Sequence, residues 1–386
     1  MLEDLLVVEL ASVLAGPSVG MFMAELGARV VKVENPGRAG DVTRGWRLPA
    51  ESSDSDISAY FSAVNWGKES LALDLRQPEG LAILHTLLKQ ADVLITSFIP
   101  GSADKLGIGP ELLQAKHPHL IIAEINGYGP DERRAAFDAI IQAEAGFTFM
   151  NGTPDGTFKM PVALMDVLAA HQLKEAVLLA IIKRLKTGEG SRVSVSLLQS
   201  GISALVNQAT NYLKAGFVPQ PVGSEHPNIV PYGTSYPTAS GDRIVLAIGN
   251  DAQFESLCQY LEIEVLPEWK SNAQRVKHRT AINHMLADKI LALDTSDIEQ
   301  ACRNRKIPAG VIRNMEQVFE QPLAQELMLQ SDDNRGIRGF VGMGDLGQST
   351  SLTPPPHLGA HTESILGELE ISKEQQQQLR SKGIIK

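Results

Sequence analysis

Short apolar runs alternate with segments of helical spacing over the first half of the chain. The runs, which predict buried strands, span residues 5–10, 28–34, 71–75, 93–95, 120–125 and 193–195. Helical spacing is found at residues 18–26, 80–90, 111–116, 167–186 and 197–214. Strands joined through helices require right-handed crossovers and therefore a parallel sheet. Because the runs are almost continuously apolar, we expect helices on both faces of that sheet.

A second, smaller domain is predicted after a polar segment rich in proline and glycine. That segment, residues 217–238, is typical of a linker, and a large domain precedes it over residues 1–216. The pattern then restarts over residues 239–320. Strands are predicted at 243–248 and 309–313, with helices at 252–261, 272–293 and 296–305 between them. We therefore predict an α/β protein with two domains.

Composition narrows the possible partners and the cellular location. The 386 residues are 43% hydrophobic and 21% charged, as in ordinary globular proteins. The net charge of −10 disfavours binding to nucleic acid or to an anionic membrane, so an anionic ligand must be held by local groups. No apolar run reaches the roughly 18 residues of a membrane span, and the acidic start of the chain does not resemble a secretory signal. A cytoplasmic location is therefore expected.

A resident metal ion is not expected. Cys258 and Cys302 are too few for a disulfide framework or a cysteine-based metal site, and the nine histidines do not show the spacing of metal ligands. The protein should therefore work without a metal.

Two motif matches were weighed against their surroundings. Residues 342–347 fit G-x-G-x-x-G, but the segment leads into polar residues and three prolines, which cannot begin the helix that a dinucleotide site needs. Residues 16–20 fit G-x-S-x-G between a strand and a helix, which makes Ser18 a candidate nucleophile. However, only one strand precedes this motif, and a structural interpretation is also available, in which Ser18 helps to begin the first turn of a helix.

A lone carboxylate in the apolar segment 161–170 is a stronger candidate for chemistry. Asp166 stands at the start of a long predicted helix. One interpretation is an N-cap that accepts backbone N–H groups. Capping does not exclude a catalytic role, because the helix N-terminus favours the ionised carboxylate and apolar walls leave it poorly solvated and more nucleophilic.

The chain resembles the class III CoA-transferases, also called the CaiB/BaiF family, over nearly its whole length. Each matching block is short, but the blocks follow one another in the family's order. They are residues 8–10, 15–17, 26–34, 40–41, 65–68, 71–74, 78–80, 91–93, 100–101, 106–107, 127–129, 137–146, 166, 187–190, 307–310 and 358–362.

The resemblance implies a formyl-CoA transferase-like enzyme in which Asp166 is the catalytic residue. The expected substrates are an acyl-CoA, which carries coenzyme A, and a small carboxylic acid. Asp166 would attack the thioester and pass through an acyl anhydride and an aspartyl-CoA thioester. No metal is needed. The glycine-rich loop of oxalate-using members is absent, which disfavours oxalate or formate as the acid.

The resemblance also implies a fold and a binding surface. The large domain would be Rossmann-like, with a parallel sheet, and built from N- and C-terminal segments, so that residues 321–386 return to it. A smaller α+β domain and an interlocked, ring-like homodimer are expected. The positions that match the family's site are Ser12, Val13, Leu14, Asn35, Leu73, Arg76, Ser97, Phe98, Lys105, Phe137 and Asp138. Asn35, Ser97 and Ile99 depart from the residues that the family often has there.

Three alternatives were considered. A 2-methylacyl-CoA racemase shares the fold, but it carries a histidine base where this chain has Phe137, which cannot transfer a proton. An acyl hydrolase would use Ser18 or Asp166 as its nucleophile. A non-catalytic acyl-CoA-binding protein would leave Asp166 without a role.

Overall fold

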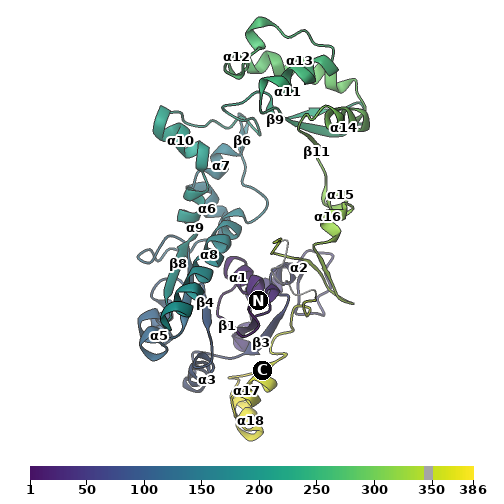
Figure 1. Ribbon diagram of the computed structural model, residues 1–386. Helices are drawn as coiled ribbons and strands as arrows, with labels where there is room; N and C mark the ends of the chain where they lie inside the picture. Colours follow the sequence, from purple (N-terminus) through teal and green to yellow (C-terminus); the bar gives the residue numbers. More distant parts are fainter. Residues whose placement is uncertain (343–350) are drawn as a thin grey trace. The chain divides into compact units, whose positions relative to one another are not determined.

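The computed structural model describes residues 1–342 and 351–386, which form two compact units. The first unit comprises residues 1–146, 160–206 and 326–386 and the second comprises residues 147–159 and 207–325. Both ends of the chain therefore lie in the first unit (Figure 1). Apart from Gly342, the G-x-G-x-x-G match at 342–347 lies outside the described residues.

A six-stranded parallel sheet lies at the centre of the first unit, in the order β3-β2-β1-β4-β5-β8. Its strands are β1 (Leu6–Glu9), β2 (Arg29–Glu34), β3 (Lys68–Ala72), β4 (Val93–Thr96), β5 (Ile121–Asn126) and β8 (Arg192–Ser196). Val8 of β1 lies opposite Val31 of β2 on one side and Leu94 of β4 on the other. The predicted parallel sheet is confirmed.

Helices cover both faces of this sheet. The unit contains α1 (Ala15–Glu25), η1 (Pro36–Arg38), η2 (Val42–Gly45), α2 (Ala59–Ser62), α3 (Pro78–Leu88), α4 (Ser102–Lys105), α5 (Pro110–Lys116), α6 (Asp138–Glu144), α8 (Leu164–Thr187), α9 (Leu197–Ser203), α17 (Thr362–Glu368) and α18 (Lys373–Ser381). Helices α1 and α8 pack together, and α8 packs on β5 and β8. On the other face, Leu84 of α3, Leu113 of α5 and Ile365 of α17 share a buried core with Val8 and Val31. Each buried aliphatic side chain of this kind stabilises the fold by about 1.5–3 kcal/mol.

The C-terminal segment joins the first unit mainly through helices. Among its described residues it adds α17, α18, the hairpin β12 (Met328–Gln330) and β13 (Arg335–Ile337), and an isolated bridge between Leu73 and Ile385. The two ends of the chain thus meet in this unit, while every strand of the six-stranded sheet comes from residues 6–196.

The second unit has a small antiparallel sheet in the order β11-β10-β9. Its elements are α7 (Phe147–Met150), β6 (Gly152–Thr153), β7 (Gly156–Thr157), α10 (Val206–Ala215), β9 (Tyr232–Pro237), β10 (Arg243–Ala247), α11 (Asp251–Tyr260), η3 (Pro267–Trp269), α12 (Asn272–Lys277), α13 (Arg279–Leu291), α14 (Thr295–Asn304), β11 (Ala309–Val311), α15 (Met315–Phe319) and α16 (Pro322–Gln325). Tyr236, Phe254 and Leu286 are among the buried residues of its own core.

Several predicted elements differ from the structure. The segment expected to be a linker, 217–238, contains strand β9. The helix expected over 197–214 is split into α9 and α10, and Val206 has a left-handed φ of 38° at the break. The helix expected over 272–293 is split into α12 and α13 at His278.

Strand β3 begins earlier than its apolar run. It starts at Lys68 rather than Leu71, because Lys68 and Ser70 are buried polar residues inside the sheet. The hydrophobic pattern takes such residues for loop, whereas the fold satisfies them with buried partners.

Candidate active site

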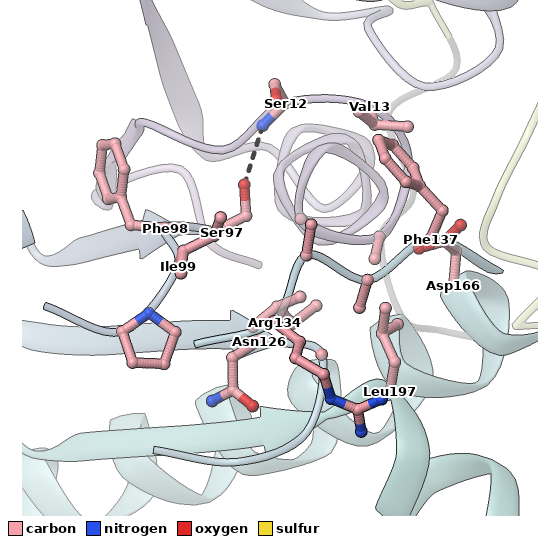
Figure 2. Close-up of a pocket in the computed structure, with 17 residues that line it drawn as sticks. Ser12, Val13, Ser97, Phe98, Ile99, Asn126, Arg134, Phe137, Asp166 and Leu197 are labelled. Atoms are coloured by element: carbon pink, nitrogen blue, oxygen red, sulfur yellow. Dashed lines mark hydrogen bonds between the residues drawn. The ribbon is translucent and has the colours of Figure 1, made fainter. Parts of the chain in front are cut away.

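The candidate site lies where the order of the central sheet changes direction. The chain leaves β1 towards β2 on one side, whereas β4 lies on the other side of β1. The loops that follow the carboxyl ends of β1 and β4 therefore diverge and leave a crevice, the usual ligand site in a sheet of this kind. A pocket of about 230 Å³ opens there, lined by these loops, by the loop after β5 and by the first turns of α1, α8 and α9 (Figure 2).

Asp166 lines this pocket from the first turn of α8. It is not the N-cap, because Ala163 holds that position and no side chain caps the helix there. Instead, the Met165 N–H donates to Oδ1 of Asp138 at 2.9 Å. The Asp166 carboxylate has no hydrogen-bond partner among the described residues, so the N-cap interpretation is wrong and the carboxylate is left available to a ligand.

Asp138 and Gln142 hold the segment that leads into α8. The Gln142 amide nitrogen donates to Oδ2 of Asp138 at 2.7 Å, and its amide oxygen accepts the Met160 N–H at 2.7 Å. The same amide nitrogen lies 3.2 Å from the carbonyl oxygens of Met160 and Val162. Asp138 thus has a positioning role beneath the pocket, and both of its oxygens are already engaged.

Burial, together with the nearby negative charge of Asp138, raises the pKa of Asp166 to about 7. A carboxylate with so high a pKa is a stronger base, and hence a stronger nucleophile, than an ordinary aspartate. The pKa of the Tyr60 hydroxyl is also raised, by burial and by the charges of Asp166, Asp138 and Asp41. Tyr60 therefore lies within the field of the same carboxylates.

The structure does not support the Ser18 alternative. Ser18 lies inside helix α1, and its hydroxyl donates to the Leu14 carbonyl oxygen at 2.7 Å. It does not stand on a strained strand-to-helix turn, and it is not among the residues that line the pocket. The position that carries the base in the racemases, Phe137, is at the N-cap of α6 and is 56% exposed.

A buried charge cluster lies against the loop between β1 and α1. It consists of Glu9, Lys32, Asp41 and Lys68, whose side chains are at most 1% exposed. Glu9 accepts from Lys32 at 2.9 Å and from Lys68 at 2.8 Å, and Lys32 lies 2.9 Å from Asp41. A Cβ at Gly20 would lie 1.9 Å from Oε2 of Glu9, so glycine is required where α1 crosses the cluster.

The buried charge cluster also binds the backbone of the loop between β1 and α1 and of the first turn of α1. Lys32 donates to the Ala11 carbonyl oxygen and Lys68 donates to that of Pro17, both at 2.8 Å. The Val13 N–H lies 3.3 Å from Oδ2 of Asp41. These contacts hold Val13 at a left-handed φ of 72°, a strained conformation for a β-branched residue, and Val13 lines the pocket.

The two lysines of the cluster have opposite pKa shifts. Burial lowers the pKa of Lys68 to about 8, even though Glu9 opposes this change. Burial acts on Lys32 as well, but the charges of Glu9, Asp41 and Glu34 outweigh it and raise its pKa. Lys32 is therefore the firmly charged centre of the cluster.

The residues predicted to bind CoA fall into three groups. Ser12, Val13, Ser97, Phe98 and Phe137 line the Asp166 pocket. A second pocket, of about 300 Å³, is lined by five of the predicted residues. These five are Ser12, Asn35, Leu73, Arg76 and Phe98. Ser12 and Phe98 line both pockets, so the pockets adjoin. Leu14 and Lys105 line neither pocket, and Asp138 is buried beneath the first.

Asn35 and Arg76 share a partner in the second pocket. Asp74 accepts from the Asn35 amide at 2.9 Å and from two nitrogens of Arg76 at 2.9 and 2.7 Å. The Arg76 side chain remains 52% exposed, so part of its guanidinium still faces solvent.

Sequence reasoning missed Arg134, Asn126 and Tyr60. The first two line the Asp166 pocket from the loop after β5, and Tyr60 is coupled to Asp166 electrostatically. No motif marks these residues, because they are single polar side chains in connecting segments.

Comparison with known proteins settles the family. The family model described as CoA-transferase family III matches residues 2–362. The chain belongs to this family. This CoA-transferase is 37% identical to the succinate–glutarate CoA-transferase of Agrobacterium fabrum, over 96% of each chain. It is 32% identical to the human succinyl-CoA:glutarate CoA-transferase, over 95% of this chain and 86% of that one.

A solved structure shows the same fold. The crystal structure of a CaiB/BaiF family protein from Brucella suis superposes on this CoA-transferase with a TM-score of 0.84 and 34% identity. The match covers 95% of this chain and 99% of that one. The predicted family is confirmed. The relatives cited are named for succinate and glutarate, so the formyl-CoA transferase-like subtype stays a prediction.

Residues 1–342 and 351–386 contain neither a membrane-spanning helix nor a group of side chains suited to a metal ion. No helix in these ranges is long and apolar enough to cross a membrane. In the same ranges, no three histidine, cysteine, aspartate or glutamate side chains are grouped so that they would hold a metal ion.

Proposed function

We propose that this CoA-transferase moves CoA from an acyl-CoA to a carboxylic acid through covalent intermediates on Asp166. The observation that carries the proposal is the carboxylate itself. It is partly buried, has no partner among the described residues, has a pKa raised to about 7, and faces a pocket at the switch point of the sheet. Such a group is about half ionised at pH 7, and its ionised form is poorly solvated, which favours attack on a thioester.

The first half of the reaction transfers CoA to the enzyme. A carboxylate oxygen of Asp166 attacks the thioester carbon, the carbon–sulfur bond breaks, and CoA leaves as a thiolate. The product on the enzyme is a mixed anhydride. The thiolate then attacks the aspartyl carbonyl carbon and expels the donor acid as a carboxylate, which leaves an aspartyl-CoA thioester.

The second half runs in the reverse sense with the acceptor acid. Its carboxylate attacks the aspartyl carbonyl carbon, releases the thiolate and forms a second anhydride. Attack of the thiolate on the acceptor's acyl carbon frees the Asp166 carboxylate and releases the new acyl-CoA. Backbone N–H groups of Ala15 and Gly16 suit the oxyanions of these steps, because both residues line the pocket in the uncapped first turn of α1.

We also propose where CoA and the acids bind. The 300 Å³ pocket, with Arg76 and Phe98 on its walls, suits the phosphates and adenine of CoA, and the adjoining Asp166 pocket suits the acyl group. The relatives named above act on succinate and glutarate. A dicarboxylic acid of this size is therefore the substrate class that we propose.

Mass spectrometry tests the covalent mechanism. The protein is incubated with succinyl-CoA, with or without hydroxylamine, and then digested. We expect a CoA adduct on the peptide that contains Asp166, and a hydroxamate at the same residue after hydroxylamine treatment. The Ser18→Ala variant should show the same labels. A label on Ser18, or turnover without any label on Asp166, would contradict the proposal.

A second copy of the chain is the proposed partner. Leu179, Ile182 and Leu185 of α8 recur every three residues and are 67%, 47% and 80% exposed, which forms an apolar stripe of a kind that usually marks an interface. Light scattering should show a dimer for the wild type and a monomer for an Ile182→Asp/Leu185→Asp variant. Lys186→Asp, on the same helix, is the charge control and should stay dimeric. A monomeric wild type would contradict this proposal.

A further inference from the structure

One cation reaches the pocket that contains Asp166. Among the described residues that line this pocket, Arg134 is the one basic side chain. It comes from the loop between β5 and α6, and Figure 2 draws it with Asn126 and Leu197 as its neighbours on the wall. A lone arginine among mainly apolar and small residues is the group that such a pocket offers to an anionic substrate.

Contacts with other described residues hold the Arg134 side chain in place but leave some of its hydrogen-bond donors unpaired. Its Nη1 donates to Oε1 of Glu144 at 3.0 Å, its Nε lies 3.5 Å from Oε2 of Glu132, and its guanidinium stacks 3.9 Å from the centre of the Tyr128 ring. The Arg134 side chain is 54% exposed, and its Nη2 has no hydrogen bond within the described part of the chain. A guanidinium has five donors, so most of its capacity remains for a ligand.

The negative charge near the pocket means that an acyl group with a second carboxylate needs a cation to bind there. Asp166 and Asp138 lie close enough for the charge of one to raise the pKa of the other. An acyl group with a second, distal carboxylate brings a further negative charge to this place. Without a cation it would be desolvated beside two carboxylates, which is strongly unfavourable.

We propose that Arg134 binds the distal carboxylate of a dicarboxylic acyl group, and that of the acceptor acid in the second half of the reaction. The substrate carboxylate takes the free Nη2 and replaces Glu132 in its 3.5 Å contact with Nε, while Glu144 keeps Nη1. Planar, two-point binding of a carboxylate is the geometry for which arginine is suited. The inference rests on the proposed function, because it assigns a specificity residue to that same site.

Two donors of matched shape test the assignment. Succinyl-CoA and butyryl-CoA differ only in that a methyl group replaces the distal carboxylate. In Arg134→Met, kcat/KM for succinyl-CoA should fall about 10- to 100-fold, the range that one charge-assisted hydrogen bond supplies. The value for butyryl-CoA should stay the same or rise. Arg134→Lys should recover part of the loss, because it keeps the charge without the two-point geometry.

Arg133 provides the matched control. It is the neighbouring arginine, but it packs on Gly101 and lines a different pocket. Arg133→Met should leave the ratio of the two donors unchanged. If Arg134→Met loses kcat/KM equally for both donors, the ratio of the two donors is unchanged. That result would show a merely structural role for Arg134 and overturn the assignment.

The label on Asp166 separates this inference from the proposed function. If the inference alone fails, butyryl-CoA and succinyl-CoA still label Asp166 in the wild type, but the donor ratio does not respond to Arg134. A wild type that prefers butyryl-CoA would also overturn the inference and leave the label intact. If the proposed function fails, neither donor labels Asp166 in the wild type.

Discussion

Replacing Asp166 by asparagine should reduce the rate of CoA transfer by about 10⁴-fold or more, as expected when a covalent nucleophile is lost. An amide cannot form the anhydride or the aspartyl-CoA thioester. Initial rates with succinyl-CoA and a dicarboxylic acid measure the effect. Asp166→Ala should behave in the same way, and Ser18→Ala should keep most of its activity. An Asp166→Asn enzyme with wild-type activity would refute the mechanism.

The same substitution should stabilise the fold. The Asp166 carboxyl has a pKa of about 7 in the folded state, against 3.8 for an ordinary aspartate. The Asp166 carboxyl therefore ionises more readily in the unfolded chain than in the folded one. As the pH rises from about 4 to 7, this difference lowers the unfolding free energy of the wild type. Below that range the variant and the wild type should be equally stable. Above pH 7 we expect Asp166→Asn to be more stable by roughly 1–3 kcal/mol.

Urea unfolding at pH 4 and pH 8 tests the sign of this effect. The difference in unfolding free energy between Asp166→Asn and the wild type should be near zero at pH 4 and positive at pH 8. A negative difference at pH 8 would show that the Asp166 charge is satisfied in the fold, which contradicts its raised pKa.

Glu9→Gln is the second substitution with a large expected effect. Glu9 bridges Lys32 and Lys68 in a cluster with almost no solvent contact. With glutamine in its place, the cluster keeps two lysines and only one carboxylate, Asp41. Breaking a buried ion pair from one side typically costs about 3–5 kcal/mol, and we expect the unfolding free energy to fall by that amount.

Chemical denaturation near pH 7 measures the loss. Glu3→Gln is the matched control, because the Glu3 side chain is 77% exposed and, within residues 1–342 and 351–386, its one ion pair is with the N-terminal amine. It should stay within about 0.5 kcal/mol of the wild type. If Glu9→Gln proved as stable as Glu3→Gln, the cluster would not be the support of the β1–α1 loop.

The central sheet could be predicted because most of its strands are marked by a local run of apolar residues. The apolar runs that became β1, β2, β4 and β5 are buried on both faces, so their pattern needs no knowledge of distant residues. Lys68 was missed as part of β3, since a buried lysine is recognisable only once Glu9 is known to lie opposite. The break before α10 was missed as well, because no proline or glycine marks the left-handed Val206.

By itself the sequence determined the alternating architecture, the family, and Asp166 as the carboxylate at the start of a long helix. These follow from local periodicity and from the order of short motifs along the chain. Only the tertiary structure decided that Asp138 lies close enough to raise the pKa of Asp166, and that Arg134 reaches the same pocket. It also brought Glu9, Lys32 and Lys68, from three different strands, into one cluster. Burial and Coulomb interactions depend on distances between residues far apart in the chain, and local sequence does not contain those distances.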